Sequence, residues 1–239
     1  MRECEIKFKL TNEYLVDRMR DNISNLGFQG SESRWELDFV PDTKNFDFRE
    51  TGLLLRIRNV SVGETSNRNL VTLKTEQKND EVQDNEEIEF FLDDTEKSEK
   101  TSQIIEEINK KVGISISSSI FADDDFDLCV SKLRREYGLT EVRSLVEKKR
   151  KVLWGSDFEV CIDEFPDPVG RFLEVSATNP EKVLDICEAI EAPMRHADKR
   201  TYGKIIGEIL DYQGARNPRV LLSENRRKNL EKYQTIYEC

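Results

Sequence analysis

The sequence predicts an α+β fold: an eight-stranded antiparallel β-barrel with helices packed outside it. Short stretches of alternating polar and apolar residues, each typical of a β-strand, recur about eight times in the 239 residues. Helical segments lie between some of these stretches, but without the regular strand–helix alternation that a parallel sheet requires. Charged residues repeat at every second position of several strands, which would direct them into the interior of a closed barrel.

The first half of the chain is predicted to be mainly β-structure. Residues 2–10 alternate in polarity and predict a strand. Apolar residues at helical spacing then predict a helix over 12–26, which Gly27 would end. The further strands predicted in this half are 34–40, 53–60, 69–76 and 86–92.

The second half is predicted to be mixed. Residues 93–125 form the least regular part of the chain, although 101–113 reads as a short helix. A second helix is predicted over 126–138, with Gly138 as its end. The remaining predicted elements are strands at 144–154, 158–165 and 171–177, helices at about 180–192 and 198–212, and a short helix at 222–237.

The charge balance limits the kinds of partner to expect. The 37 basic and 48 acidic residues give a net charge of -11, which argues against general binding to nucleic acid or to anionic membranes. A local basic cavity remains compatible with this total, because net charge averages over position. No stretch approaches the roughly 18 apolar residues of a membrane span, and the first residues lack the apolar core of a signal peptide. We therefore expect a cytoplasmic protein.

Cysteine and histidine usage restricts the metal chemistry. The five cysteines are scattered, with neither CxxC pairs nor the spacing of a metal site, so free thiols in a reducing compartment are expected. His196 is the single histidine, which excludes a site built from several imidazoles. Any metal would have to be held by carboxylates, and this donor set favours a hard ion such as Mg²⁺ or Mn²⁺.

Charged side chains at i, i+2 spacing recur in separate predicted strands. In any one strand they are explained by a solvated outer face. Across many strands this explanation weakens, because a solvated face would mix Ser, Thr, Gln and Asn with the charges. The charged sets are Glu3/Glu5/Lys7, Arg56/Arg58, Lys74, Glu87/Glu89 and Lys148/Arg150.

A barrel interior lined by both signs of charge would be costly if it were dry and empty. Basic side chains pair with phosphate oxygens, and Arg does so through two parallel hydrogen bonds. Carboxylates alone would repel phosphate, but a divalent ion held by them would bridge the two. The pattern therefore predicts a wet interior that binds a metal-bound polyanion such as a triphosphate.

Several of these stretches resemble, in the same order, the motifs of the CYTH group of triphosphate tunnel metalloenzymes. This group takes its name from class IV adenylyl cyclase and thiamine triphosphatase, and the spacing around 34–58 resembles the class IV cyclase-like branch most. Glu3-Cys4-Glu5-Ile6-Lys7 is similar to the group's ExExK signature. The other matching stretches are Asp47-Phe48 leading into Leu53-Leu54-Leu55-Arg56-Ile57-Arg58, Leu73-Lys74, Glu86-Glu87-Ile88-Glu89, Lys148 with Arg150, Asp163 followed by Gly170 and Phe172-Leu173-Glu174, and Arg200-Thr201-Tyr202.

The resemblance implies a domain organisation and a set of site residues. Residues 1–212 would form one CYTH-like tunnel domain with an insertion at about 94–125, and 213–239 would form a basic, helical tail. Lys74 and Glu5 would be the catalytic residues. Phosphates would be bound by Lys7, Arg56, Arg58, Lys74, Lys148, Arg150 and Arg200, and Mg²⁺ or Mn²⁺ would be held by Glu3, Glu5, Glu87, Glu89, Asp163 and Glu174.

The sequence departs from the family pattern at two positions. The acidic strand of the family often opens with Arg, and here that position is Asn85. The last strand usually reads Glu-x-Glu, and here it reads Glu174-Val175-Ser176. Because a serine hydroxyl cannot replace a charged carboxylate ligand, one metal site is expected to be weaker, shifted or lost.

Three functions are compatible with this pattern. The first is metal-dependent hydrolysis of tripolyphosphate or of a nucleoside or organic triphosphate. The second is a class IV adenylyl cyclase, which would make cyclic AMP and pyrophosphate from ATP. The third is a non-catalytic module that binds triphosphates or nucleotides, which the serine at position 176 favours. The ligand is in each case a triphosphate small molecule, and a homodimer stays open, as does a tunnel-capping or dimer role for the basic tail.

Overall fold

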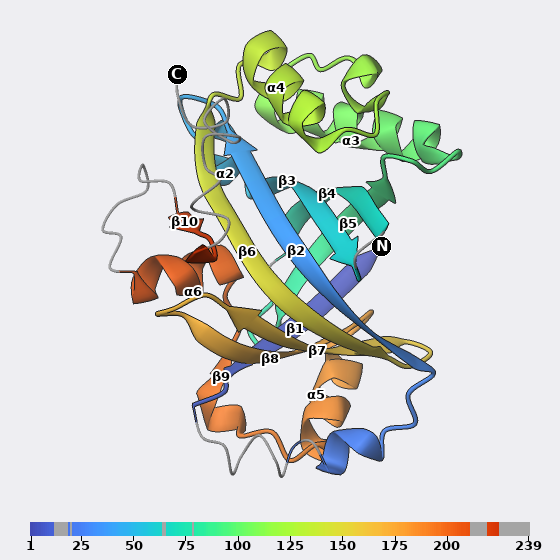
Figure 1. The fold of residues 1–239 in the computed structure, drawn as a ribbon, viewed down its shortest axis with the longest axis vertical. Coiled ribbons are helices and arrows are strands. Elements are labelled where there is room, and N and C mark those ends of the chain that lie inside the picture. Colours follow the sequence, from blue (N-terminus) through green and yellow to red (C-terminus); the bar gives the residue numbers. More distant parts are fainter. Residues whose placement is uncertain (12–18, 20, 64–65, 78, 211–218, 225–239) are drawn as a thin grey trace. The chain divides into compact units, whose positions relative to one another are not determined.

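The computed structural model describes residues 1–239 except 12–18, 20, 64–65, 78, 211–218 and 225–239 (Figure 1). Its main strands are β1 (Arg2–Lys9), β2 (Gly30–Asp42), β3 (Leu53–Val62), β4 (Ser66–Gln77), β5 (Gln83–Phe91), β6 (Glu141–Trp154), β7 (Phe158–Phe165) and β8 (Gly170–Ala177), with short strands β9 (Ala197–Asp198) and β10 (Arg219–Leu221). Its helices are α2 (Asp47–Glu50), α3 (Lys97–Val112), α4 (Phe126–Tyr137), α5 (Pro180–Ala189) and α6 (Tyr202–Ile209), with 3₁₀ turns η1 (Ser118–Phe121) and η2 (Met194–His196).

The strand order closes on itself. Neighbouring strands are hydrogen-bonded in the order β6-β2-β3-β4-β5-β1-β8-β7, and β7 pairs again with β6. The pairings of β1 with β5 and β8, of β3 with β4, and of β7 with β6 and β8 are antiparallel, and the short β10 adds a parallel pairing to β6. The predicted α+β fold with a closed eight-stranded antiparallel barrel and helices outside it is therefore confirmed.

The chain divides into two compact units, which are described separately. Unit 1 comprises 1–35, 76–86 and 148–212, and unit 2 comprises 36–75, 87–147 and 213–239. Each unit has a hydrophobic core of its own.

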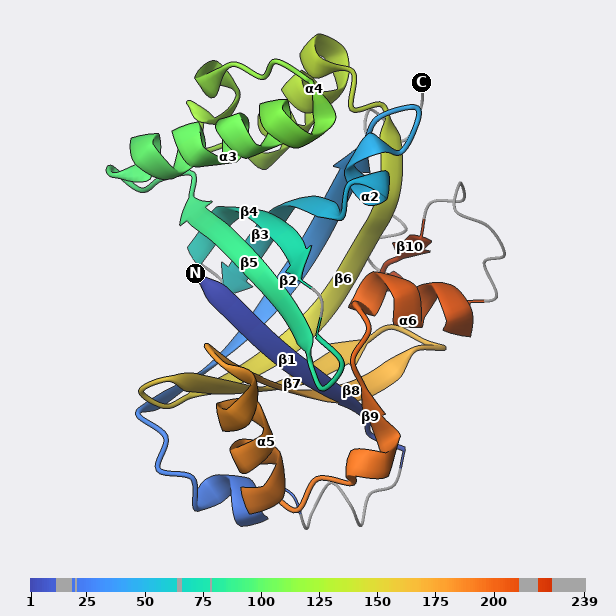
Figure 2. The same cartoon turned by 180° about the vertical axis from the view of Figure 1, so that it is seen from behind.

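In unit 1, the core lies between one face of the sheet and helix α5. Helix α5 lies beside the sheet (Figure 2). Cys4, Ile6 and Phe8 alternate along β1 and belong to the same core as Val175 of β8 and Ile186 of α5. These residues occupy every second position of their strands, so the other face of β1 and β8 is left for polar side chains.

In unit 2, helices α3 and α4 lie side by side and share the core with the strands (Figure 2). Leu55 and Ile57 of β3 are fully buried in this core, together with Ile104 of α3 and Val130 of α4. Helix α4 begins at the Asp125 carboxylate, which accepts a hydrogen bond from the Leu128 amide. It ends at Gly138, whose φ of 72° suits a left-handed cap and confirms the predicted helix end.

Most predicted elements agree with the structure in type, and their bounds differ by a few residues. The helix predicted over 198–212 begins only at Tyr202, because Asp198 belongs to the short strand β9, and the four-residue helix α2 was not predicted. The strands are longer than predicted at several ends, and β10 was not predicted because three residues carry too little periodicity. Of the helix predicted over 12–26, residues 19 and 21–24 are helical, and the rest of its first part lies outside the described residues. The helix predicted at 222–237 lies almost wholly outside them. The domain bounds inferred from the family resemblance stay predictions.

Two further expectations concern membranes and thiols. Among the described residues, no helix is both long and apolar enough to cross a bilayer. The four cysteines in the described part of the chain, Cys4, Cys129, Cys161 and Cys187, are buried free thiols.

Candidate functional site

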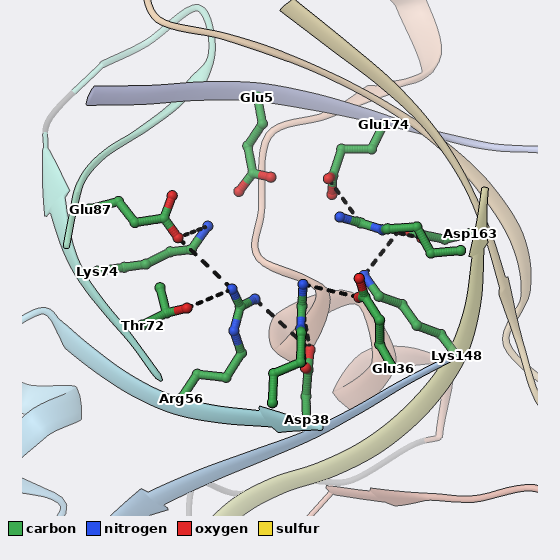
Figure 3. Close-up of polar contacts among 12 residues, drawn as sticks. Glu5, Glu36, Asp38, Arg56, Thr72, Lys74, Glu87, Lys148, Asp163 and Glu174 are labelled. Carbon is green, nitrogen blue, oxygen red and sulfur yellow. Dashed lines mark hydrogen bonds and ion pairs between the residues drawn. The ribbon is translucent and has the colours of Figure 1, made fainter. Parts of the chain in front are cut away.

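Unit 1 contains a buried group of charged side chains, here called the Arg150 cluster. It lies on the face of β1 and β8 opposite the apolar core, because strand alternation sends Glu5, Lys7 and Glu174 to that face. Figure 3 shows Glu5, Glu174, Asp163 and Lys148 pointing toward one another. The cluster consists of Glu5, Lys7, Gln83, Lys148, Arg150, Asp163 and Glu174.

Asp163 is the central acceptor of the Arg150 cluster. Its two carboxylate oxygens accept hydrogen bonds from Nε and Nη2 of Arg150 at 2.6 and 2.5 Å. Lys148 Nζ donates to the same carboxylate at 3.3 Å, and Arg150 Nη2 also donates to Glu174 at 2.9 Å. This bidentate arrangement fixes the guanidinium plane, so Arg150 is held ready as a planar donor.

Lys7 lies between two carboxylates of the same cluster. Its Nζ is 3.1 Å from Glu5 and 3.8 Å from Glu174, and it donates to Gln83 Oε1 at 2.9 Å. All four residues are at least nine-tenths buried. The Glu5 and Glu174 carboxylates thus already share one cation, which shows that their spacing suits a positive charge between them.

Unit 2 contains a second group, here called the Arg58 cluster. Arg58 donates to Asp38 at 2.5 and 2.8 Å, and its Nη1 lies 3.0 Å from Glu36, which has no exposed surface. Figure 3 shows Glu36 and Asp38 on the strand next to β3. The cluster consists of Glu36, Asp38, Arg56, Arg58, Thr72, Lys74 and Glu87.

Arg56 and Lys74 connect the Arg58 cluster to β5. Arg56 lies across from Thr72 in the β3–β4 pairing and donates to its hydroxyl at 3.1 Å. Glu87 lies 3.8 Å from Arg56 and 3.4 Å from the Lys74 ammonium, and Asp38 lies 3.9 Å from Arg56 (Figure 3). These longer separations mark pairs that a ligand can rearrange more readily than the close Arg58–Asp38 pair.

Both clusters neutralise their own charges. A buried cation or carboxylate is stable only when it is paired and hydrogen-bonded, because leaving water costs several kcal/mol per ion. A phosphate group offers the same kind of oxygen acceptor as a carboxylate. An anionic ligand can therefore replace the carboxylates as the partner of the lysines and arginines, so that these cations stay paired.

Three of the residues that the family resemblance implied are not members of either cluster. Glu3 is half-buried and lies across from Asn85 in the β1–β5 pairing. Glu89 is exposed. Arg200 is exposed and donates to Asp198 and Glu208. The roles assigned to these three residues stay predictions.

The structure adds residues that the sequence reasoning did not single out. Glu36 and Asp38 have the i, i+2 spacing of the other charged pairs, and this spacing within residues 34–40 could have identified them. Gln83 carried no such signal, because its side chain is uncharged and the pattern rested on charged residues.

Glu159 also lies close to the Arg150 cluster. In the strand pairing, Ser176 lies across from Glu5 on one side and from Glu159 on the other. Although the Glu159 side chain is exposed, desolvation raises the pKa of its carboxyl group, Arg150 acts against this rise, and Glu174 adds to it. Glu159 therefore places a carboxylate beside the position where the family pattern has one and this chain has serine.

The donor chemistry of the Arg150 cluster fits the hard cation that the sequence predicts. Among the described residues, no three acidic, thiol or imidazole side chains are gathered as a ready metal cage. Lys7 accounts for this in the Arg150 cluster, because its ammonium lies between the two carboxylates. Glu5 and Glu174 supply the oxygen donors that Mg²⁺ and Mn²⁺ prefer, so these residues fit the metal.

Comparison with known protein families gives a match over most of the chain. Residues 1–202 match the CYTH domain. The chain belongs to the CYTH domain family. Members of this family are enzymes that act on triphosphates and in general depend on metal ions. No curated protein shows a significant match to the chain.

Solved structures share the CYTH fold at low sequence identity. The PH1819 protein of Pyrococcus horikoshii OT3 is 16% identical, covers 86% of this chain and 98% of its own, and has a TM-score of 0.53. A candidate adenylate cyclase of Vibrio parahaemolyticus is 16% identical, with coverages of 86% and 97% and a TM-score of 0.51. A conserved hypothetical protein of Pyrococcus furiosus is 18% identical, with coverages of 85% and 99% and a TM-score of 0.50. At these identities the likeness shows the fold alone.

The burial of the Arg58 cluster predicts a large effect of Arg58→Leu on stability. The variant would leave the fully buried Glu36 carboxylate without its arginine, so the free energy of unfolding should fall by about 3–5 kcal/mol. The matched control is Arg68→Leu, because Arg68 pairs with Asp93 where both side chains are at least 40% exposed. That variant should lose at most about 1 kcal/mol in urea denaturation. Equal losses for the two variants would contradict the arrangement described.

Proposed function

We propose that this chain is a metal-dependent triphosphatase that hydrolyses tripolyphosphate or a nucleoside or organic triphosphate. The observation that supports it best is the Arg150 cluster, where three buried cations and three buried carboxylates interleave within one group. Cations alone would suit any anion. The interleaved carboxylates suit a ligand that also carries a cation, as a metal–triphosphate complex does.

The cations of the Arg150 cluster would bind the phosphate chain. Arg150 presents a planar fork that matches two oxygens of one phosphoryl group, and Lys7 and Lys148 add point charges. Their interactions strengthen as negative charge builds on the phosphoryl oxygens and on the leaving group, so they favour the transition state over the bound substrate.

The carboxylates of the same cluster would hold the metal ion. Glu5 and Glu174 are its ligands in this proposal, and Asp163 keeps Arg150 and Lys148 in position. A bound Mg²⁺ or Mn²⁺ supplies charge neutralisation on the phosphates and lowers the pKa of a bound water. Glu5, which the family resemblance implied to be catalytic, would take part in the reaction as a ligand of this metal ion.

In unit 2, the Arg58 cluster offers the same kind of phosphate donors. Arg56 and Lys74 have the longer and more exchangeable pairings, whereas Arg58 is locked to Asp38. We assign phosphate binding to Arg56 and Lys74 and a share in orienting the attacking water to Lys74. Arg58 serves mainly to hold the acidic residues of β2 in place.

Two other functions predicted from the sequence are separated by their products. An adenylyl cyclase would form cyclic AMP and pyrophosphate from ATP, and a binding module would form no product from any triphosphate. A screen of tripolyphosphate, ATP and other triphosphates with Mg²⁺ and Mn²⁺ distinguishes all three. Phosphate release supports hydrolysis, cyclic AMP supports the cyclase, and binding without turnover supports the module.

The proposal predicts a strong loss of hydrolysis in Lys74→Ala and Arg150→Lys. Each removes a donor aimed at developing phosphoryl charge, so kcat for tripolyphosphate should fall by about 10²–10³-fold, measured as phosphate release. Lys149→Ala is the control, because Lys149 neighbours Arg150 on β6 but is exposed on the opposite face. If the Lys149 variant lost as much activity as the Arg150 variant, the assignment would be wrong.

The sequence-based prediction that cations on separate strands bind one polyanion has its own test. Lys74→Ala, Lys148→Ala and the double variant are compared for tripolyphosphate affinity by calorimetry. A shared ligand should give a coupling energy of about 0.5–3 kcal/mol, whereas independent sites should add to within about 0.5 kcal/mol. Additive losses would overturn the prediction of a shared ligand and leave the hydrolysis assay unaffected.

The position of Glu159 predicts that it compensates for Ser176. Glu159→Gln should weaken Mn²⁺ binding roughly tenfold, and adding Ser176→Glu in that background should restore it, because either residue places a carboxylate in the same cross-strand row. Mn²⁺ affinity is measured by electron paramagnetic resonance. Glu164→Gln is the control, since Glu164 is exposed on the other face of β7. Unchanged affinity in Glu159→Gln would exclude this role.

A further inference from the structure

Tyr202 closes one side of the Arg150 cluster with an aromatic surface. It is the first residue of α6, and Thr201 caps the helix by accepting a hydrogen bond from the Lys204 amide. The Tyr202 ring packs on Phe165 and Phe172, with ring centroids 4.9 and 5.6 Å apart. This packing fixes the ring plane, because two aromatic neighbours at steep angles leave it little freedom to tilt.

Two ammonium groups of the cluster lie on the Tyr202 ring. Lys7 Nζ is 5.1 Å and Lys148 Nζ is 5.0 Å from the ring centroid. Both distances fall in the range of cation–π attraction, and both lysines are almost fully buried. The ring therefore helps to hold two long, flexible side chains at the positions that the proposed function assigns to phosphate binding.

The hydroxyl of Tyr202 is less well satisfied than the ring. Its oxygen is buried and makes no hydrogen bond of standard geometry with any residue that the structure describes, although the Asp163 carboxylate lies near enough to interact with it. Burial raises the pKa of this hydroxyl well above its usual value, and the charges of Asp163 and Glu174 add to the rise. The Tyr202 hydroxyl is therefore a donor that no acceptor in the described residues engages with good geometry.

A phenylalanine at this position would preserve the ring contacts without burying an unsatisfied hydroxyl. A buried polar group that lacks a partner destabilises the folded chain, and native proteins contain few of them. The orphaned hydroxyl beside two ammonium groups therefore suits a ligand that is anionic and accepts hydrogen bonds. A metal ion is excluded as its partner, because a neutral phenol between two cations is a poor ligand for a third.

We propose that the Tyr202 hydroxyl donates a hydrogen bond to a phosphate oxygen of the bound triphosphate, while the Tyr202 ring keeps Lys7 and Lys148 in place. This inference rests on the proposed function and adds a neutral phosphate-binding residue to it. Tyr202 would serve the ligand in two separable ways, one through the hydroxyl and one through the ring.

The two contributions are separated by Tyr202→Phe and Tyr202→Leu. Affinity for inorganic tripolyphosphate is measured by calorimetry in EDTA, where no turnover occurs, and also with Mg²⁺, and stability is measured by thermal unfolding. Tyr202→Phe should bind about ten- to a hundredfold more weakly, as expected for one lost hydrogen bond to a charged group, with an unchanged or higher Tm. Tyr202→Leu should also lose the lysine support, so it should bind more weakly still and have a lower Tm.

Tyr137→Phe is the matched control, because Tyr137 of α4 packs against the hydrophobic core of unit 2 and belongs to neither charged cluster, so this variant should leave tripolyphosphate affinity unchanged. If Tyr202→Phe binds tripolyphosphate with wild-type affinity, whether or not its Tm is lower, the hydroxyl has a purely structural role. That result would overturn this inference and leave the proposed function standing. If the wild-type chain itself fails to bind tripolyphosphate, with and without Mg²⁺, the proposed function fails and this inference falls with it.

Discussion

The need to pair every buried charge is the constraint on which the rest of this structure depends. Strand alternation gives each strand one apolar and one charged face, and the charged faces are largely removed from water. A desolvated ammonium or carboxylate is unstable unless an opposite charge or a hydrogen-bond partner reaches it. The sheet therefore cannot place its lysines and arginines without also placing its acids, and the two kinds of residue occupy neighbouring strands.

Because of this constraint, the same strand pairing stabilises the fold and assembles the site. Ile57 is buried in the core of unit 2, and its two neighbours in sequence, Arg56 and Arg58, belong to the charged face. A slip of one residue in the pairing of β3 would bury both arginines among aliphatic side chains. The register that forms the core is thus the same register that assembles the cations, and neither can form without the other.

The strands and the charged faces were predictable because they depend on period-two patterns that are local in sequence. What could not be predicted is which acid pairs with which base. The match between Arg150 and Asp163 depends on the β6–β7 register, which no single strand encodes. Glu36 and Asp38 follow the same i, i+2 pattern and could have been predicted from it, whereas only the family resemblance indicated Tyr202. Its contact with two lysines arises from the packing of α6, which is a tertiary effect.

The charge balance within the clusters bears on what they can bind. With all side chains ionised, the Arg150 cluster holds three cations and three carboxylates, and the Arg58 cluster holds the same numbers. A triphosphate bound to such a neutral cluster would add several uncompensated negative charges in a poorly hydrated environment. A divalent cation bound together with it removes part of that excess and gives the displaced carboxylates a new partner. Neutral clusters of this composition therefore favour a metal–polyanion pair over either component alone, and this preference follows from charge counting before any catalytic step is considered.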